Sequence, residues 1–287
     1  MSVPTLAAPS QGAPSAVADS YARLHEVYTG LRVTELGPEE KAPQGGGWVT
    51  AARLAEGGAD LEAFLAWDDA QVLKDYGVQA RPDVVASFGL HRYAWPATLL
   101  ITVPWFLHRR VPRFPVADVS FQRTLGRLAV RTDGFACLPG DPAASLPGAR
   151  VVPDEEALRA EVRTSVAHHL GPLLDGFGPR MRRRSRFLWS LATDEIVEGL
   201  WYVAHLLGEE QRAMTELERL LPGATKPYVG TAGFRELTGP NGEKLPTRDR
   251  ASCCMFYTLR PDDPCVTCPR TCDAERVARL TETAAAG

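Results

Sequence analysis

The chain has 287 residues, 45% of them hydrophobic and 23% charged, and a formal net charge of −3 at pH 7. This balance is that of a soluble globular protein with one large or two small domains, and it gives no support for a nucleic-acid partner. The longest apolar run, residues 95–107, is shorter than the ~20 residues of a membrane span and contains prolines. We therefore expect a cytoplasmic protein without a membrane span.

Three parts are expected along the chain. Residues 1–18 are rich in Ala, Pro and Ser and lack the charged start and apolar core of a secretory signal, which predicts a disordered tail. Residues 19–150 are expected to form a helical part with a small sheet, and residues 151–287 a second helical part that ends in a cysteine-rich segment. The expected fold class is α+β, mostly helical, with a small antiparallel sheet in the middle and a C-terminal cysteine-rich loop.

Helical spacing of apolar residues predicts the first helices. Gly77 is expected to end one of them, and Pro82 to open a mostly apolar helix that carries His91, Arg92, Tyr93 and Trp95. The helices before Gly77 are expected over residues 17–31, 50–57 and 60–76.

From residue 111 to residue 137 the sequence is dense in Val, Phe, Arg and Thr, with short alternations of apolar and polar residues. Residues 116–121 and 128–132 alternate as strands do, and Asp133-Gly134 is a two-residue turn signal. Residues 135–138 are therefore predicted to be the return strand of a hairpin, with Cys137 on it as a small buried side chain. The proline-rich residues 139–153 are expected to be a loop.

The second half is predicted to return to helices. Asp154 is expected to cap a helix that runs to about residue 174, and its adjacent histidines, His168 and His169, face different sides and make a poor metal pair. Gly176-x-Gly178 follows a helix and lacks a third glycine, so the dinucleotide-binding fingerprint fails. Further helices are expected over 187–207, 209–221 and 273–283, with a Gly/Pro-rich stretch over 225–250 that turns at residues 240–242.

Four of the six cysteines lie close together near the C-terminus. Cys253 and Cys254 are adjacent, ten residues follow, and Cys265 and Cys268 close the set. Three interpretations remain open: structural disulfides, which cytosolic proteins rarely keep; a structural zinc ion, for which only one Cys-x-x-Cys knuckle is present; and an iron–sulfur cluster, which accepts four thiolates from a wider set of directions.

This spacing resembles the signature of the FhuF-like siderophore ferric-reductase family. The similarity includes Arg248 and Arg250 before the cysteines, Tyr257 after the pair and Pro269 after the last cysteine, and the motif itself covers about sixteen residues. The resemblance implies a 2Fe-2S cluster held by four ligands, which are Cys253, Cys254, Cys265 and Cys268. Cys272 is an extra cysteine beyond the pattern, and neither it nor Cys137 is expected to ligate.

The resemblance also implies a function. A cytoplasmic ferric-siderophore reductase would pass one electron to a ferric siderophore, with the hydroxamate type favoured, and release Fe(II). Because no nucleotide fingerprint is present, an external donor such as a ferredoxin or a flavin reductase is expected. The alternatives are a non-catalytic zinc-stabilised binding protein and an iron–sulfur redox sensor.

Two groups of residues are secondary candidates under this reading. Tyr257 and Arg260 are the nearest candidates for contact with the siderophore, and part of the group from His91 to Trp95 is a further one. Five arginines between residues 180 and 186 are either a solvated helix start or a docking patch for an acidic donor or an anionic chelate.

Overall fold

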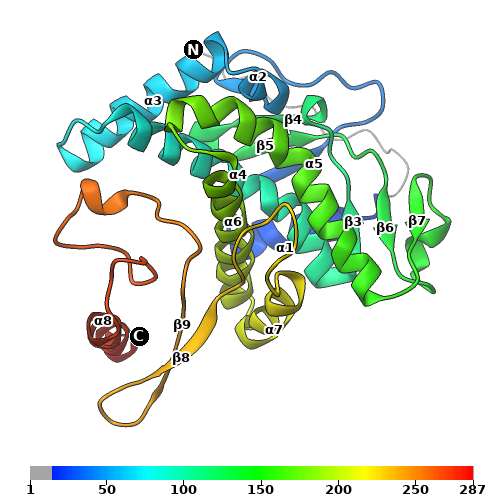
Figure 1. The fold of residues 1–287 in the computed structure, drawn as a ribbon. Helices are drawn as coiled ribbons and strands as arrows, with labels where there is room; N and C mark the ends of the chain where they lie inside the picture. Colours follow the sequence, from blue (N-terminus) through cyan, green and yellow to red (C-terminus); the bar gives the residue numbers. More distant parts are fainter. Residues whose placement is uncertain (1–14, 287) are drawn as a thin grey trace.

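The computed structural model describes residues 15–286 and is mainly helical, with small sheets (Figure 1). The expected α+β class is confirmed. The α-helices of the described residues are α1 (Ala18–Val27), α2 (Ala51–Ala55), α3 (Ala59–Tyr76), α4 (Pro82–His108), α5 (Glu155–Met181), α6 (Ser185–Leu206), α7 (Glu210–Leu220) and α8 (Asp273–Ala286).

The strands form small sheets beside the helices. Their order is β1-β5-β4-β2 in one sheet and β3-β6-β7 in another, and β8 pairs with β9 as a hairpin. The pairs β1–β5 and β6–β7 are parallel, so these two sheets are mixed rather than antiparallel throughout as expected. The strands are β1 (Arg32–Glu35), β2 (Trp48–Thr50), β3 (Arg110–Pro112), β4 (Val119–Gln122), β5 (Arg127–Val130), β6 (Phe135–Cys137), β7 (Ala149–Val151), β8 (Phe234–Thr238) and β9 (Lys244–Arg248).

Helix α4 lies in the middle of the molecule, with α3, α5 and α6 packed around it (Figure 1). Its sequence is apolar on all sides, which is typical of a helix that is enclosed by others. Pro82 occupies its first turn, where a missing N–H costs no hydrogen bond, and Trp105 and Phe106 are fully buried near its end. One continuous core joins α4 to α5 and α6 and includes residues as far along the chain as Leu259.

Several boundaries differ from those expected. The first helix ends at Val27 rather than residue 31, and the helix capped by Asp154 continues to Met181. The expected loop over 139–153 contains strand β7, and the stretch over 225–250 contains the β8–β9 hairpin, which turns at residues 240–242 as expected. The disordered tail expected over residues 1–18 falls mostly outside the described residues, although Val17 is already buried against the core.

The hairpin expected at Asp133-Gly134 is wrong. Strand β5 pairs with β4 and β1, whereas β6 pairs with β3 and β7 in the other sheet. Residues 131–134 therefore connect one sheet to the next without a hairpin turn. Gly134 has a positive φ, and a Cβ there would lie 2.6 Å from the carbonyl oxygen of Gly148, so this connection needs glycine for a reason other than a hairpin.

The cysteine segment leaves the helical body after β9. Residues 249–272 form a loop with one 3₁₀ turn, Phe256–Thr258, and they lead into α8. Figure 1 shows this loop in orange, on the far side of α6 from the β3-β6-β7 sheet. Across the described residues, no helix combines the length and the apolar character that crossing a membrane requires.

Candidate iron–sulfur site

A buried carboxylate on α6 holds the start of the cysteine segment. Asp194 is fully buried, and its two oxygens accept hydrogen bonds from the backbone N–H of Ala251 (3.0 Å), the backbone N–H of Ser252 (2.8 Å) and the Ser252 hydroxyl (2.6 Å). The guanidinium of Arg248, which is also fully buried, donates to the same carboxylate at 2.6 Å. The residue directly before Cys253 is thus fixed to a rigid helix.

A second buried charge holds the end of the segment. The Arg276 guanidinium, from α8, donates to the backbone carbonyls of Cys268 (3.1 Å), Thr271 (3.2 Å) and Arg248 (3.2 Å). It also pairs with the carboxylate of Asp249 at 2.8 Å. Because an arginine fork can bind several oxygens at once, this one side chain joins the two arms of the loop and α8.

The four cysteine sulfurs meet in two pairs. The thiol of Cys265 hydrogen-bonds the sulfur of Cys254, and Cys253 and Cys268 share a second hydrogen bond. Among the described residues, no three His, Cys, Asp or Glu side chains have the arrangement of a site for one metal ion. Four thiols in two adjacent pairs fit a cofactor with two iron atoms and four cysteine ligands.

The surroundings favour negative charge on one of these sulfurs. The hydrogen bond from Cys265 and the guanidinium of Arg250 lower the pKa of Cys254 to about 6, and the Phe256 backbone N–H adds to this. Burial raises the pKa of Cys253, and the shared proton with Cys254 raises that of Cys265. Since iron binds the thiolate rather than the thiol, this environment favours Cys254 as the first of the four thiols to ligate.

Aromatic side chains place the turn after Cys254 against the helical body. The Phe256 ring lies 5.6 Å from that of Tyr76 at the end of α3 and 6.3 Å from that of Phe88 on α4. Met255 has a positive φ and is buried, and the guanidinium of Arg183 lies 3.5 Å from its sulfur. The segment is therefore packed against α3, α4 and the α5–α6 turn.

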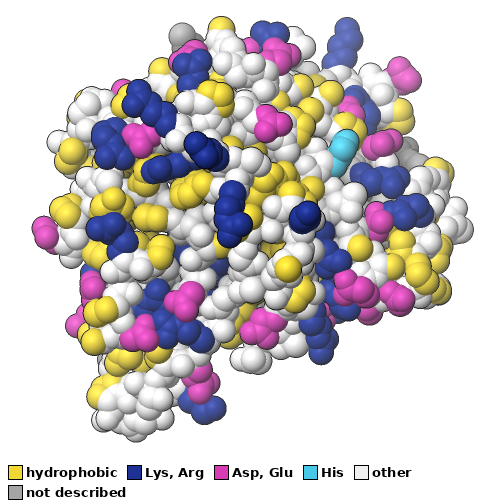
Figure 2. All heavy atoms as spheres, in the orientation of Figure 1, with side chains coloured by type: hydrophobic (Ala, Val, Ile, Leu, Met, Phe, Trp, Pro, Cys, Tyr) yellow, Lys and Arg dark blue, Asp and Glu magenta, His cyan; other side chains and the backbone are white. Residues whose placement is uncertain are grey.

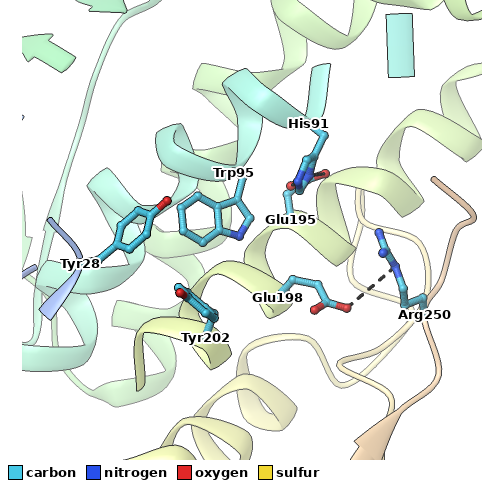
Figure 3. A pocket seen from close by; sticks show the side chains of 7 residues that line it. All are labelled: Tyr28, His91, Trp95, Glu195, Glu198, Tyr202 and Arg250. Atoms are coloured by element: carbon cyan, nitrogen blue, oxygen red, sulfur yellow. Dashed lines mark hydrogen bonds and ion pairs between the residues drawn. The ribbon is translucent and has the colours of Figure 1, made fainter. Parts of the chain in front are cut away.

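A cavity of about 370 Å³ opens beside this segment (Figure 3). Three aromatic side chains, one just after the end of α1 and the others from α4 and α6, form one part of it. The rings of Tyr28 and Trp95 are 5.5 Å apart and those of Tyr28 and Tyr202 5.8 Å apart. The remaining lining is charged or titratable and consists of His91, Glu195, Glu198 and Arg250.

The charged side of this cavity is organised by pairs. The Glu195 carboxylate lies 2.8 Å from Nδ1 of His91. Desolvation opposes a charge on His91, but the charge of Glu195 and its hydrogen bond together outweigh this, so that the pKa of His91 is raised. Arg250 lies 3.9 Å from Glu198 and 3.7 Å from Asp194. Because Arg250 also interacts with Cys254, it connects the cavity to the sulfurs.

The structure separates the residues of α4 that the sequence grouped together. His91 and Trp95 are four positions apart and line the cavity on one face of the helix. Arg92 instead pairs with the buried Asp68 at 2.8 Å, and the Tyr93 hydroxyl hydrogen-bonds His169 in the core. Only half of that group therefore lies near the candidate site.

The other candidates from the sequence lie outside the cavity lining. The guanidinium of Arg260 lies 5.7 Å from the Tyr76 ring, and Tyr257 lies beneath Arg270 at 4.2 Å. Cys137 is fully buried in β6, and Cys272 is exposed just before α8.

The carboxylates of α6 escaped the sequence analysis. Asp194, Glu195 and Glu198 stand in a helix that is otherwise strongly apolar, and the first two are buried. Charged side chains are rarely buried without a partner, so acidic residues inside such a helix are the signal that could have indicated a site.

The cysteine segment matches a known family model. Residues 250–270 match the model described as the FhuF 2Fe-2S C-terminal domain, which spans the four paired cysteines and Arg250. No curated protein matches the chain. The resemblance inferred from the cysteine spacing is thus confirmed over this segment, and the match favours a cluster over a single zinc ion. This protein therefore carries a FhuF 2Fe-2S C-terminal domain, and its cofactor is a 2Fe-2S cluster.

Proposed function

We propose that this protein is a cytoplasmic ferric-siderophore reductase that binds its substrate in the cavity beside the cysteine segment. The observation that supports this most directly is the position of Arg250, which lines the cavity and interacts with Cys254. His91, which also lines the cavity, interacts electrostatically with Cys254 as well, so two titratable groups of the cavity are coupled to this cysteine.

The chemistry of iron explains why one electron is enough. Hydroxamate and catecholate oxygens are hard donors that hold Fe(III) tightly, and the lower charge density of Fe(II) weakens the same bonds. In the proposed reaction Fe(III) gains one electron and becomes Fe(II), which the chelate then releases. A 2Fe-2S cluster supplies single electrons, and its potential depends on charge and hydrogen bonding around the sulfurs.

The four paired cysteines are the proposed ligands. In this assignment Cys253, Cys254, Cys265 and Cys268 would hold the cluster, and their side chains already interact in two pairs, Cys253 with Cys268 and Cys254 with Cys265. Asp194 and Arg276 would keep the two arms of the loop in place when the oxidation state changes. Arg250 would offset negative charge on the sulfurs.

The lining of the cavity favours some chelates over others. Tyr28, Trp95 and Tyr202 offer aromatic faces for the apolar linkers of a siderophore. Glu195 pairs with His91 and Glu198 lies near Arg250, so the lining has no excess of positive charge to hold a strongly anionic ferric catecholate, and it suits a neutral or cationic ferric hydroxamate better. The hydroxamate type is therefore the proposed substrate class.

An external donor completes the proposal. The Gly176-x-Gly178 sequence lies within α5 and does not follow a strand, so it lacks the context of a dinucleotide site. We expect that NADPH alone leaves the protein oxidised and that a ferredoxin or a flavin reductase restores reduction.

Anaerobic mixing of the reduced protein with ferric siderophores tests the proposed function. Reoxidation should be fast with ferric hydroxamates and slow with ferric catecholates. Tyr202→Ala should weaken the apparent affinity about tenfold, because one aromatic wall is lost. Leu206→Ala, one turn further along α6, is also exposed but lies outside the cavity lining and serves as the control. If no ferric chelate reoxidises the protein, the proposal fails.

A further inference from the structure

Five arginines lie across the turn between α5 and α6 rather than at a single helix start. Arg180 is in the last turn of α5 and pairs with Glu62, which accounts for it structurally. Arg182 is the C-cap of α5, Arg184 is the N-cap of α6, and Arg186 lies in the first turn of α6. The last three side chains are exposed.

No ion pair among the described residues requires these three charges, although the helix dipole favours a positive charge at the C-cap of α5, where Arg182 stands. Arg182, Arg184 and Arg186 make no ion pair with any acidic side chain that the structure describes, although the chain contains 35 acidic residues. At the start of α6, positive charge is opposed by the helix dipole, so Arg184 and Arg186 do not stabilise the helix. Arg183 differs from these three arginines because its guanidinium stacks on the Phe187 ring, 5.0 Å from the ring centroid.

The turn lies directly beside the cysteine segment. Arg183 contacts the sulfur of Met255. Met255 directly follows Cys254, so the Cα atoms of these two residues are only about 3.8 Å apart. Two more exposed arginines, Arg260 and Arg270, flank the same segment. Figure 2 shows Lys and Arg side chains gathered where α3 and the α5–α6 turn lie in Figure 1.

This basic face is separate from the substrate cavity. The cavity lining includes none of these exposed arginines, and its own arginine, Arg250, is largely buried. The cysteine segment can therefore be approached both through the cavity and over the α5–α6 turn. Two routes suit a reaction in which an electron arrives from one partner and leaves to another.

We propose that the face formed by Arg182, Arg184 and Arg186, beside Met255, is the docking surface for an acidic electron-donor protein of the ferredoxin class. The inference rests on the proposed function insofar as it assumes an external donor. One electron passes from the donor to the cofactor: the donor is oxidised, the cofactor is reduced, and no covalent bond forms or breaks. Opposite charges on the two surfaces raise the association rate by about 10- to 1,000-fold at low salt.

The test uses the cluster-loaded protein, without siderophore, and a plant-type ferredoxin of strongly negative net charge. Binding is followed by the fluorescence anisotropy of labelled ferredoxin, and cluster reduction by absorbance, both from low to high salt. In the variant Arg182→Gln/Arg184→Gln/Arg186→Gln we expect association about tenfold or more slower at low salt, with a flatter salt dependence. Arg183 is left in place because it packs on Met255.

A matched control removes the same charge elsewhere. The variant Arg32→Gln/Lys41→Gln/Lys226→Gln changes three exposed cations outside this face and should behave like the wild type. Equal effects in the two variants, or no effect in the first, would overturn the proposal, as would loss of iron and sulfide from the first variant. Because siderophore is absent, a failure of the proposed substrate reaction does not affect this outcome.

Discussion

Replacing Asp194 with Asn should release the cysteine segment from α6. The carboxylate accepts four hydrogen bonds, and its partner Arg248 is as fully buried as Asp194 itself. An amide keeps one acceptor oxygen and no charge, so the buried guanidinium loses one of its two carboxylate partners and keeps only Glu198, at 3.0 Å. Breaking a buried pair in this way costs about 3–5 kcal/mol, which is a large share of the ~5–15 kcal/mol that stabilises a typical domain.

The assay combines two measurements on the same sample. Denaturant unfolding gives the loss of stability, and iron and sulfide analysis gives the fraction of protein that retains its cluster. We expect Asp194→Asn to lose about 3–5 kcal/mol and to retain less cluster than the wild type. The control Asp75→Asn removes a carboxylate that has a single surface hydrogen bond to Gln71, and it should change stability by less than about 0.5 kcal/mol.

A double variant separates lost charge from lost hydrogen bonds. Adding Arg248→Met to Asp194→Asn removes the buried guanidinium that has lost its partner Asp194 and should recover part of the stability. Wild-type stability and full cluster content in Asp194→Asn would refute the reasoning. A double variant that is less stable than Asp194→Asn alone would show that unpaired charge is not the cause.

Three further predictions concern the cluster, pH and the backbone. Serine in place of any one of the four proposed ligands should bleach the visible absorbance, whereas Cys137→Ser and Cys272→Ser should preserve it; the reverse would refute the ligand assignment. Burial lowers the pKa of His169 from 6.5 to about 4, so the unfolded chain binds more protons and stability should fall by roughly 3 kcal/mol as pH drops from 6.5 to 4. In urea titrations at different pH values, His169→Gln should make stability depend less on pH between 6.5 and 4. An unchanged pH dependence would contradict the role given to His169. Gly126→Ala should destabilise by more than 1 kcal/mol beyond Gly45→Ala, since both glycines have a positive φ but only the Cβ at position 126 would clash with a backbone oxygen, that of Gly30. An equal loss of unfolding free energy in the two variants would contradict the predicted clash at position 126.

The elements whose signals are local were predictable from the sequence. Asp154 caps α5 by accepting from the Ala157 backbone N–H, and Gly77 ends α3 in the left-handed conformation, as expected. Capping and helical periodicity depend on neighbours within about one turn, so a linear reading detects them. The cysteine spacing is local in the same sense, and it was enough to indicate the cofactor.

Strand pairing and the cavity were decided only by the tertiary structure. Residues 131–134 form no hairpin turn: β5 pairs with its neighbour β4 and with the distant β1, whereas β6 pairs with β3 and β7. Hydrogen bonding between distant strands leaves no local signal in the sequence. His91 and Glu195 are 104 positions apart and meet only because α4 packs against α6. The sequence by itself thus determined the helices, most of their ends and the cofactor-binding motif. Packing of distant helices decided which carboxylates hold the cysteine loop and which side chains face the cavity beside it.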